Sequence, residues 1–206
     1  MASQGSVARR PRPFVILEIR QLLIAWNIHE TVNAAVPDSS APTLPDPPSG
    51  YAERMPRIPE ASSLVEVGPD YLGREAQLVP EAAAAWNLMR DAALDEGVEL
   101  LLLSAFRSVA RQTAIVAAKL AKGQTLDQIL VVSAYPGFSE HHSGQAIDIG
   151  TSGARHFEEE FEATTAFAWL VVRARDFGFA LSYPRDNPFG IAYEPWHWRH
   201  GGTSVP

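Results

Sequence analysis

Seven of the sixteen prolines lie between residues 37 and 60, and Pro45, Pro47 and Pro48 are among them. Proline fixes φ and removes a backbone N–H donor, so a segment this rich in proline cannot sustain a helix or a sheet. The stretch is therefore predicted to be an extended linker. It divides the chain into an N-terminal extension, residues 1–60, and a folded domain, residues 61–206.

The segment before this linker contains an apolar run over residues 14–28, interrupted by Glu18, Arg20 and Gln21. Those polar side chains make the run a poor core for a secretory signal and too polar to cross a bilayer. We expect an amphipathic helix that packs on the folded domain, with a weak export signal as the alternative. No transmembrane span is predicted.

The chain contains no cysteine. This excludes a disulfide framework, a thiol nucleophile and a zinc site with Cys ligands, so any metal ion must be held by His, Asp or Glu. Hydrophobic residues make up 46% of the 206 residues, which is enough for a domain with a core of its own. The net charge of −7 comes without a basic stripe, so no nucleic-acid partner is expected. The oligomeric state is not predicted.

Helical and strand patterns are intermixed after residue 60 without a regular βαβ rhythm. Helices are predicted from residue 80 to Gly97, from Ser108 to Gly123, and over residues 164–177, with glycine as the expected C-terminal cap. Strands are predicted over residues 98–103, 145–149 and 179–183 and around 196–198. We therefore expect an α+β domain with a small, mainly antiparallel sheet.

Five of the six histidines fall between residues 141 and 200, mostly in two segments. The first runs from Pro136 to Asp148 and the second from Tyr193 to His200. Hydrolysis at a metal ion needs three protein ligands, an open fourth position and a nearby carboxylate that takes a proton from water. The clustering therefore indicates a hydrolytic metal centre in one of the usual His and carboxylate ligand sets.

The spacing of these residues suggests individual roles. His141 and Asp148 are seven residues apart, so a loop that enters a strand can bring both side chains to one point, and His197 can supply the third ligand. Glu194, three residues before His197, is the natural general base. Pro195 excludes the helical His-Glu-x-x-His arrangement, so the pair must lie on an extended or turning segment.

Together with Ser104-Ala105-Phe106-Arg107-Ser108-Val109-Ala110-Arg111-Gln112, the two segments resemble the VanY-type D-alanyl-D-alanine carboxypeptidases. These are zinc peptidases of the LAS group, with the hedgehog/DD-peptidase fold. The family pattern is Ser-Gly-Tyr-Arg-Ser-x-x-x-Gln, then Ser-x-His-x-x-Gly-x-(Ala/Ser)-x-Asp, then Glu-Pro-Trp-His. The resemblance covers roughly residues 65–202.

The resemblance implies that zinc is held by His141, Asp148 and His197, and that Glu194 is the general base. It also implies that Arg107 polarises the scissile carbonyl and holds the oxyanion. Ser139 and Gln112 would help to bind the substrate backbone or its terminal carboxylate. Glu140 is expected to fix the loop around His141, and His142 to lie at the surface or behind the ligands.

The activity so implied is removal of the terminal D-Ala from peptidoglycan stem peptides or precursors that end in D-Ala-D-Ala. Ala105-Phe106 replaces the Gly-Tyr of the family pattern, which changes the expected substrate preference more than the chemistry. A D,D-dipeptidase, an L-Ala–D-Glu endopeptidase and a non-catalytic zinc-containing wall-binding module are the alternatives. Because no convincing signal peptide is visible, we expect a cytoplasmic protein. If the substrate is mature peptidoglycan, we expect an extracytoplasmic one.

Overall fold

A four-stranded antiparallel sheet forms the centre of the fold. A computed structural model of the chain describes residues 42–201, so the helix predicted over residues 14–28 lies outside the described residues. The strands are β3 (Leu101–Ser104), β4 (Ala146–Gly150), β5 (Phe179–Leu181) and β6 (His197–His200), in the order β3-β4-β6-β5. The predicted α+β class with a small antiparallel sheet is confirmed. Within the described range, no helix is long and apolar enough to cross a membrane.

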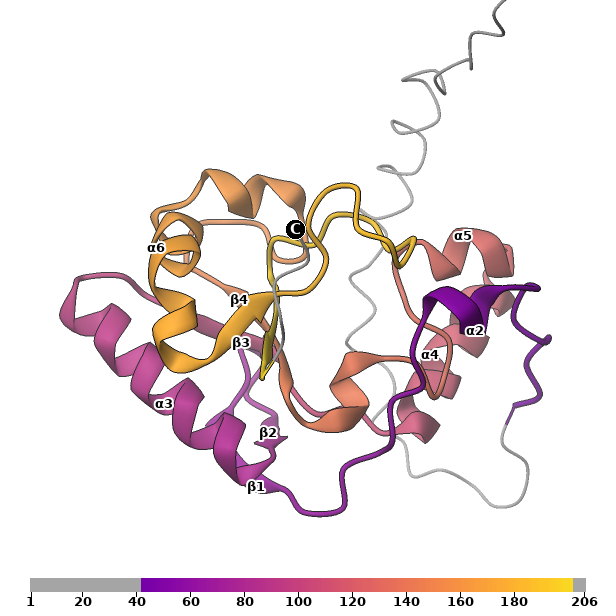
Figure 1. The fold of residues 1–206 in the computed structure, drawn as a ribbon, viewed down its shortest axis with the longest axis horizontal. Helices are drawn as coiled ribbons and strands as arrows, with labels where there is room; N and C mark the ends of the chain where they lie inside the picture. The colour runs from indigo at the N-terminus through magenta and orange to yellow at the C-terminus, as the bar shows by residue number, and fades with distance from the viewer. Residues whose placement is uncertain (1–41, 202–206) are drawn as a thin grey trace, which may run out of the picture. The chain divides into compact units, whose positions relative to one another are not determined.

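Helices lie on both sides of this sheet (Figure 1). On one side are α3 (Pro80–Asp95) and α6 (Thr165–Arg173), which continues into the 3-10 helix η3 (Ala174–Phe177). On the other side are α2 (Tyr51–Arg54), α4 (Val109–Ala121) and α5 (Leu126–Leu130). Ser108 caps α4 as predicted, since its hydroxyl accepts a hydrogen bond from the backbone N–H of Arg111 at 3.1 Å.

The main core lies between the sheet and the pair α3 and α6. All five residues of β4 are buried, because this strand has a neighbour on each edge and helices over it. Fully buried side chains from both helices and from the strands fill this core, among them Trp86, Met89, Ile147, Ile149, Leu170 and Phe179. Burial of each such side chain stabilises the fold by roughly 1.5–3 kcal/mol, so the sheet is a rigid platform for the groups at its ends.

A second, smaller core joins α2 and α5 to the loops of the other side. It contains Tyr51, Leu130, Phe138 and Tyr183. Helix α2 falls inside the segment predicted to be an extended linker, and it forms because no proline occurs from residue 49 to 55. Tyr51 is 1% exposed, and its hydroxyl accepts a hydrogen bond from the backbone N–H of Tyr135 at 2.9 Å. The division into domains at residue 60 stays a prediction.

Two features of the sheet region differ from the sequence expectation. The hairpin β1 (Val65–Pro69) and β2 (Glu75–Leu78) was not predicted. In addition, β3 begins at Leu101 rather than at residue 98, because the backbone N–H of Val98 donates to the carbonyl of Ala93 and so completes the C-terminal turn of α3.

Candidate metal centre and catalytic site

Two neighbouring strands and one short helix carry the three predicted metal ligands. Asp148 in β4 and His197 at the start of β6 are directly paired across the two strands. His141 lies in the 3-10 helix η1 (Glu140–Ser143), which ends at Gly144 with φ +66° and returns the chain into β4. A Cβ at Gly144 would lie 2.9 Å from Leu64 Cδ2, so only glycine fits this return. The turn therefore explains the seven-residue spacing of His141 and Asp148.

The three side chains converge on one point. His141 Nε2 lies 3.1 Å from Asp148 Oδ2, and His197 Nδ1 lies 3.0 Å from Asp148 Oδ1. One donor atom from each residue can be chosen so that all lie within 4.8 Å of one another, and all three residues are buried. Donors at the 2.0–2.1 Å typical of zinc are about 3.3 Å apart in a tetrahedron. The donor set and its spacing therefore fit a zinc ion.

The second nitrogen of each histidine is held by another group. His141 Nδ1 lies 2.7 Å from the carbonyl oxygen of Ala105, and His197 Nε2 lies 3.0 Å from Glu140 Oε2. Glu140 is held in turn by Arg199, at 3.3 Å. Such partners fix the ring orientation of ligating histidines. The sequence did not identify them, although the expectation that Glu140 supports this loop agrees with its position.

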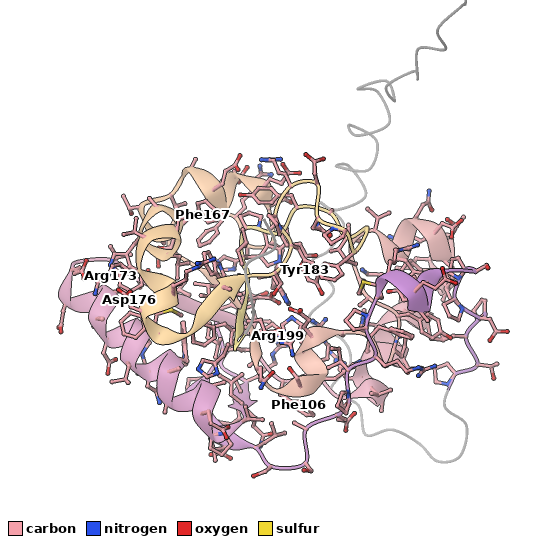
Figure 2. The ribbon with its side chains drawn as sticks, in the orientation of Figure 1. Phe106, Phe167, Arg173, Asp176, Tyr183 and Arg199 are labelled. Atoms are coloured by element: carbon pink, nitrogen blue, oxygen red, sulfur yellow. The ribbon has the colours of Figure 1, made fainter. Side chains whose placement is uncertain are left out.

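The ring of Tyr183 lies against His197, with 4.8 Å between the ring centroids. Figure 2 shows Tyr183 and Arg199 between the two groups of helices, where the strand ends meet the loops. Tyr183 belongs to the smaller core, so this core contacts one of the predicted metal ligands directly.

The two histidines among these three residues differ in their electrostatics, because burial lowers the pKa of His141 to about 4 despite the opposing charge of Asp148. Burial would lower the pKa of His197, but its hydrogen bonds to Asp148 and Glu140 outweigh this and raise the pKa to about 10. Burial also favours the neutral acid at Asp148, yet both histidines hold the pKa of that carboxyl well below its usual range. The carboxylates of Asp148 and Glu140 thus favour positive charge at His197, next to the point where a metal cation would bind.

Glu194 lies at the edge of this centre. The backbone N–H of His197 donates to the carbonyl of Glu194 at 3.1 Å, which closes a turn and brings Glu194 Oε2 to 3.8 Å from His197 Nδ1. The predicted turning segment is thus present. Burial, followed by the charge of Asp148, raises the pKa of Glu194 to about 7, against the opposing effects of His197, Arg107 and Lys119. A carboxyl that titrates near neutral pH can both accept and return a proton.

Arg107 reaches the same region from the end of β3. Its backbone N–H donates to the carbonyl of His141 at 3.2 Å, and its own carbonyl accepts from His142 Nδ1 at 2.6 Å. His142 is fully buried and lies behind the ligands, one of its two expected places. Burial lowers the pKa of Arg107, whereas the charges of Asp148 and Glu194 raise it. The guanidinium Nε has no hydrogen-bond partner among the described residues.

The two residues predicted to contact substrate are both buried. Gln112 is 1% exposed, and its amide nitrogen donates to the carbonyl of Ala134 at 2.6 Å. Its oxygen Oε1 has no hydrogen-bond partner within the described part of the chain. Oε1 is therefore the atom of Gln112 through which the predicted contact with substrate would be made. Ser139 immediately precedes η1 and is 5% exposed. Substrate roles for both residues stay predictions.

Lys119 was not singled out from the sequence. It lies on the inner face of α4 with Gln112 and Val116, and it is 8% exposed. Burial and, to a smaller extent, the charge of Arg107 lower its pKa to about 8, against the opposing charge of Glu194. Lys119 follows Gln112 and Val116 at the i, i+4, i+7 spacing of one helix face, which could have indicated that it points inward. Buried lysines are rare, so an exposed lysine was the default expectation.

We expect Lys119→Met to raise the free energy of unfolding of the metal-free chain at pH 7 by about 3 kcal/mol, because the folded state then no longer buries a charged amine. The folded-state pKa of Lys119 is lowered from 10.5 to about 8, so the cost is full below pH 8 and disappears as pH rises to 10.5. Urea unfolding of both proteins at pH 7 and pH 10.5 measures this, with Lys122→Met as the exposed control. A variant less stable than the wild type at pH 7 would contradict the expectation.

Comparison with known proteins gives a consistent set of matches. The family model "VanY: D-alanyl-D-alanine carboxypeptidase" matches residues 75–203. The putative carboxypeptidase YodJ of Bacillus subtilis is 39% identical over 129 residues, which are 61% of this chain and 46% of that protein. The D-alanyl-D-alanine carboxypeptidase of Enterococcus faecalis is 34% identical over 125 residues, 56% of this chain and 45% of that one. The chain thus spans about half the length of these curated relatives.

Solved structures resemble the fold. The LD-carboxypeptidase LdcB has a TM-score of 0.62 and 34% identity, covering 69% of this chain and 70% of that one. A variant of the vancomycin-resistance D,D-pentapeptidase VanY in complex with Zn(II) has a TM-score of 0.55 and 30% identity, covering 71% and 83%. VanYB in complex with D-alanine-D-alanine has a TM-score of 0.55 and 29% identity, covering 71% and 82%.

Proposed function

Because the chain belongs to the VanY D-alanyl-D-alanine carboxypeptidase family, we propose that it is a zinc-dependent D,D-carboxypeptidase. It removes the terminal D-Ala from peptidoglycan stem peptides or precursors that end in D-Ala-D-Ala. The observation that carries the proposal is the convergence of His141, Asp148 and His197 on one point beside Glu194. The E. faecalis relative is a D-alanyl-D-alanine carboxypeptidase, and VanY and VanYB have been solved with Zn(II) and with D-alanine-D-alanine.

In this proposal His141, Asp148 and His197 hold zinc, which polarises the scissile carbonyl and activates water. Glu194 removes a proton from the attacking water, and the hydroxide oxygen bonds to the carbonyl carbon of the penultimate D-Ala. The guanidinium of Arg107 stabilises the negative charge that develops on the carbonyl oxygen. Glu194 then returns the proton to the leaving nitrogen as the C–N bond breaks. The products are the shortened peptide with a new carboxylate and free D-alanine.

The similarity to LdcB favours one second candidate. An LD-carboxypeptidase removes a D-residue that follows an L-residue, so its substrate is a stem tetrapeptide that has already lost one D-Ala. The two activities share the metal, the base and the arginine. They differ in the residue whose carbonyl is attacked, which is a D-alanine in one substrate and an L-residue with a different side chain in the other.

The proposal is tested with the zinc-loaded chain and two muramyl peptides, a pentapeptide that ends in D-Ala-D-Ala and the corresponding tetrapeptide. Mass spectrometry follows the products with and without a chelator. Chelator-sensitive loss of one alanine from the pentapeptide alone supports the D,D-carboxypeptidase. Loss from the tetrapeptide alone supports the second candidate. Intact peptides would reject both, and the experiment then moves to free D-Ala-D-Ala and to intact sacculi, the substrates of the dipeptidase and endopeptidase.

A further inference from the structure

The last part of the proline-rich segment packs against the loops of the site. We call residues 51–61 the brace; it begins with α2 and continues without regular secondary structure to residue 61. Three of its side chains are almost completely buried, those of Tyr51, Met55 and Ile58. The family model matches residues 75–203, so the brace precedes the part of the chain that the family pattern describes. The family assignment therefore does not explain its burial.

The brace contacts the loop that carries His141 on both sides of this predicted ligand. The backbone N–H of Ile58 donates to the carbonyl of Gly137 at 2.9 Å, and the backbone N–H of Ala61 donates to the carbonyl of His142 at 2.8 Å. Gly137 lies four residues before His141, and His142 directly follows it. The two hydrogen bonds therefore fix the loop on either side of the ligand.

Tyr51 attaches the brace to the same loop and to a second segment. Its hydroxyl accepts a hydrogen bond from the backbone N–H of Tyr135 at 2.9 Å, and its ring meets the ring of Phe138 edge-on, with 5.2 Å between the centroids. Tyr51 also shares the smaller core with Tyr183, which follows β5. Through this core Tyr51 links the loop before η1 to the segment after β5.

The segment after β5 leads to the general base. The ring of Tyr183 lies against His197, and the carbonyl of Tyr183 accepts a hydrogen bond from the backbone N–H of Glu194 at 3.1 Å. Arg54 of the brace holds a further point of this segment, because its Nε donates to the carbonyl of Phe189 at 3.1 Å. The brace is thus bound to the segment that carries Glu194.

The sheet positions the other two ligands without the brace. Asp148 and His197 are directly paired across β4 and β6, so the sheet sets their separation. His141 lies in η1, outside the sheet, and Glu194 lies in the turn before β6. Because neither residue belongs to a strand, its position depends on the contacts of its loop. The contacts of the brace therefore reach the two groups that the sheet does not fix.

We propose that the brace positions His141 for the metal ion and Glu194 for proton transfer, with Tyr51 as its principal positioning residue. The role toward Glu194 rests on the proposed function, whereas the role toward His141 requires only metal binding. The brace then belongs to the catalytic domain, although it precedes residue 61. The alternative is that Tyr51 only stabilises the fold as a whole, as any buried aromatic side chain does, and the experiments separate these two roles.

The first test measures the zinc affinity of the full-length chain by competition with a chromophoric chelator. We expect Tyr51→Leu to bind zinc about 10-fold or more weakly than the wild type, the lower end of the range for residues that orient metal ligands. Tyr51→Phe keeps the ring in the smaller core and should restore most of the affinity. If Tyr51→Leu does not fold, Ala61→Pro takes its place, because it removes the N–H that donates to His142.

Met89→Ala is the matched control, because Met89 is fully buried in the main core and its truncation also destabilises the fold. The affinities are measured where circular dichroism shows that each metal-free variant is folded, so that a lower stability alone does not change them. Wild-type affinity in Tyr51→Leu would overturn the proposal, and so would equal losses in Tyr51→Leu and Met89→Ala.

Hydrogen exchange followed by mass spectrometry gives a local readout that needs neither metal nor substrate. In Tyr51→Leu we expect faster exchange over residues 136–144 and 183–194, while β4 keeps its protection, because only the loops lose a contact. Uniformly faster exchange along residues 42–201 would show that Tyr51 acts on global stability alone, which would overturn the proposal.

The pentapeptide assay tests the role toward Glu194. Arg54 is exposed, so Arg54→Ala should fold as the wild type does. We expect its kcat at saturating zinc to fall by about 2- to 10-fold, the equivalent of one hydrogen bond, with little change in KM. Arg90→Ala, which removes an arginine of α3 paired with Asp91, should keep the wild-type kcat. Unchanged kcat in Arg54→Ala would overturn the role toward Glu194, whereas absence of turnover in the wild type would reject the proposed function.

Discussion

Replacing Glu194 with glutamine should lower kcat by about 10²- to 10⁴-fold, the usual contribution of a proton-transfer group. Glutamine keeps the shape of the side chain and leaves the three metal ligands in place, but it cannot accept a proton from water or return one to the leaving amine. KM should change little, because the lost interaction belongs to the transition state. Release of D-alanine from the pentapeptide by the zinc-loaded variant measures the effect.

The matched control is Glu66→Gln, an exposed glutamate of β1 whose replacement should leave kcat unchanged. Zinc content, determined by elemental analysis, should stay at about one ion per chain in both variants, since Glu194 is not a ligand in the proposed set. Full activity of Glu194→Gln with zinc bound would show that another group moves the proton, and the assigned mechanism would be wrong.

Replacing Asp148 with alanine should remove the metal and the activity together. Asp148 contacts both histidines, at 3.1 Å and 3.0 Å, so its loss leaves two ligands without the group that joins them. We expect zinc content near zero and a loss of activity of at least about 10⁴-fold, because Lewis-acid stabilisation and activation of water disappear at once. Elemental analysis and the pentapeptide assay measure both effects.

Asp176→Ala serves as the control, because Asp176 is an exposed aspartate of η3 whose contact is Arg173 (Figure 2). Asp148→Asn keeps the volume of the buried side chain and should lose most of the zinc while remaining folded by circular dichroism. Retention of one zinc ion per chain in Asp148→Ala would show that the ion is bound elsewhere.

Much of the fold could be predicted from local signals. Ser108 and the glycines at 97, 123 and 178 mark helix ends because capping is a local property. The hairpin of β1 and β2 was not predicted, since β1 is largely exposed and β2, although it alternates between exposed and buried residues, does so over four positions only. Helix α2 was not predicted, because its stability comes from the packing of Tyr51 against residues far away in the sequence. The four residues of the helix do not reveal such long-range packing by themselves.

The candidate site divides in the same way. His141, Asp148, His197 and Glu194 were predictable as a group because their sequence spacing reflects one turn and one pair of strands. Their supporting partners were not predictable, because they depend on register. The carbonyl of Ala105 meets His141 only where β3 and its following loop lie beside η1. The burial of Lys119 was not predicted either, because it becomes visible only when helix α4 is packed against the rest of the fold.

The direct pairing of Asp148 and His197 has a consequence for stability as well as for chemistry. The two residues are 49 positions apart in the sequence, and the chain between them includes α6 and β5. A metal ion bound to both would close this loop. Closing a loop of that length lowers the conformational entropy of the unfolded chain, which stabilises the folded state by about 4 kcal/mol. The ion would act as a cross-link whose strength depends on the concentration of free metal. A chain without cysteine would thereby obtain the constraint of a disulfide in a form that chelation, and not reduction, removes.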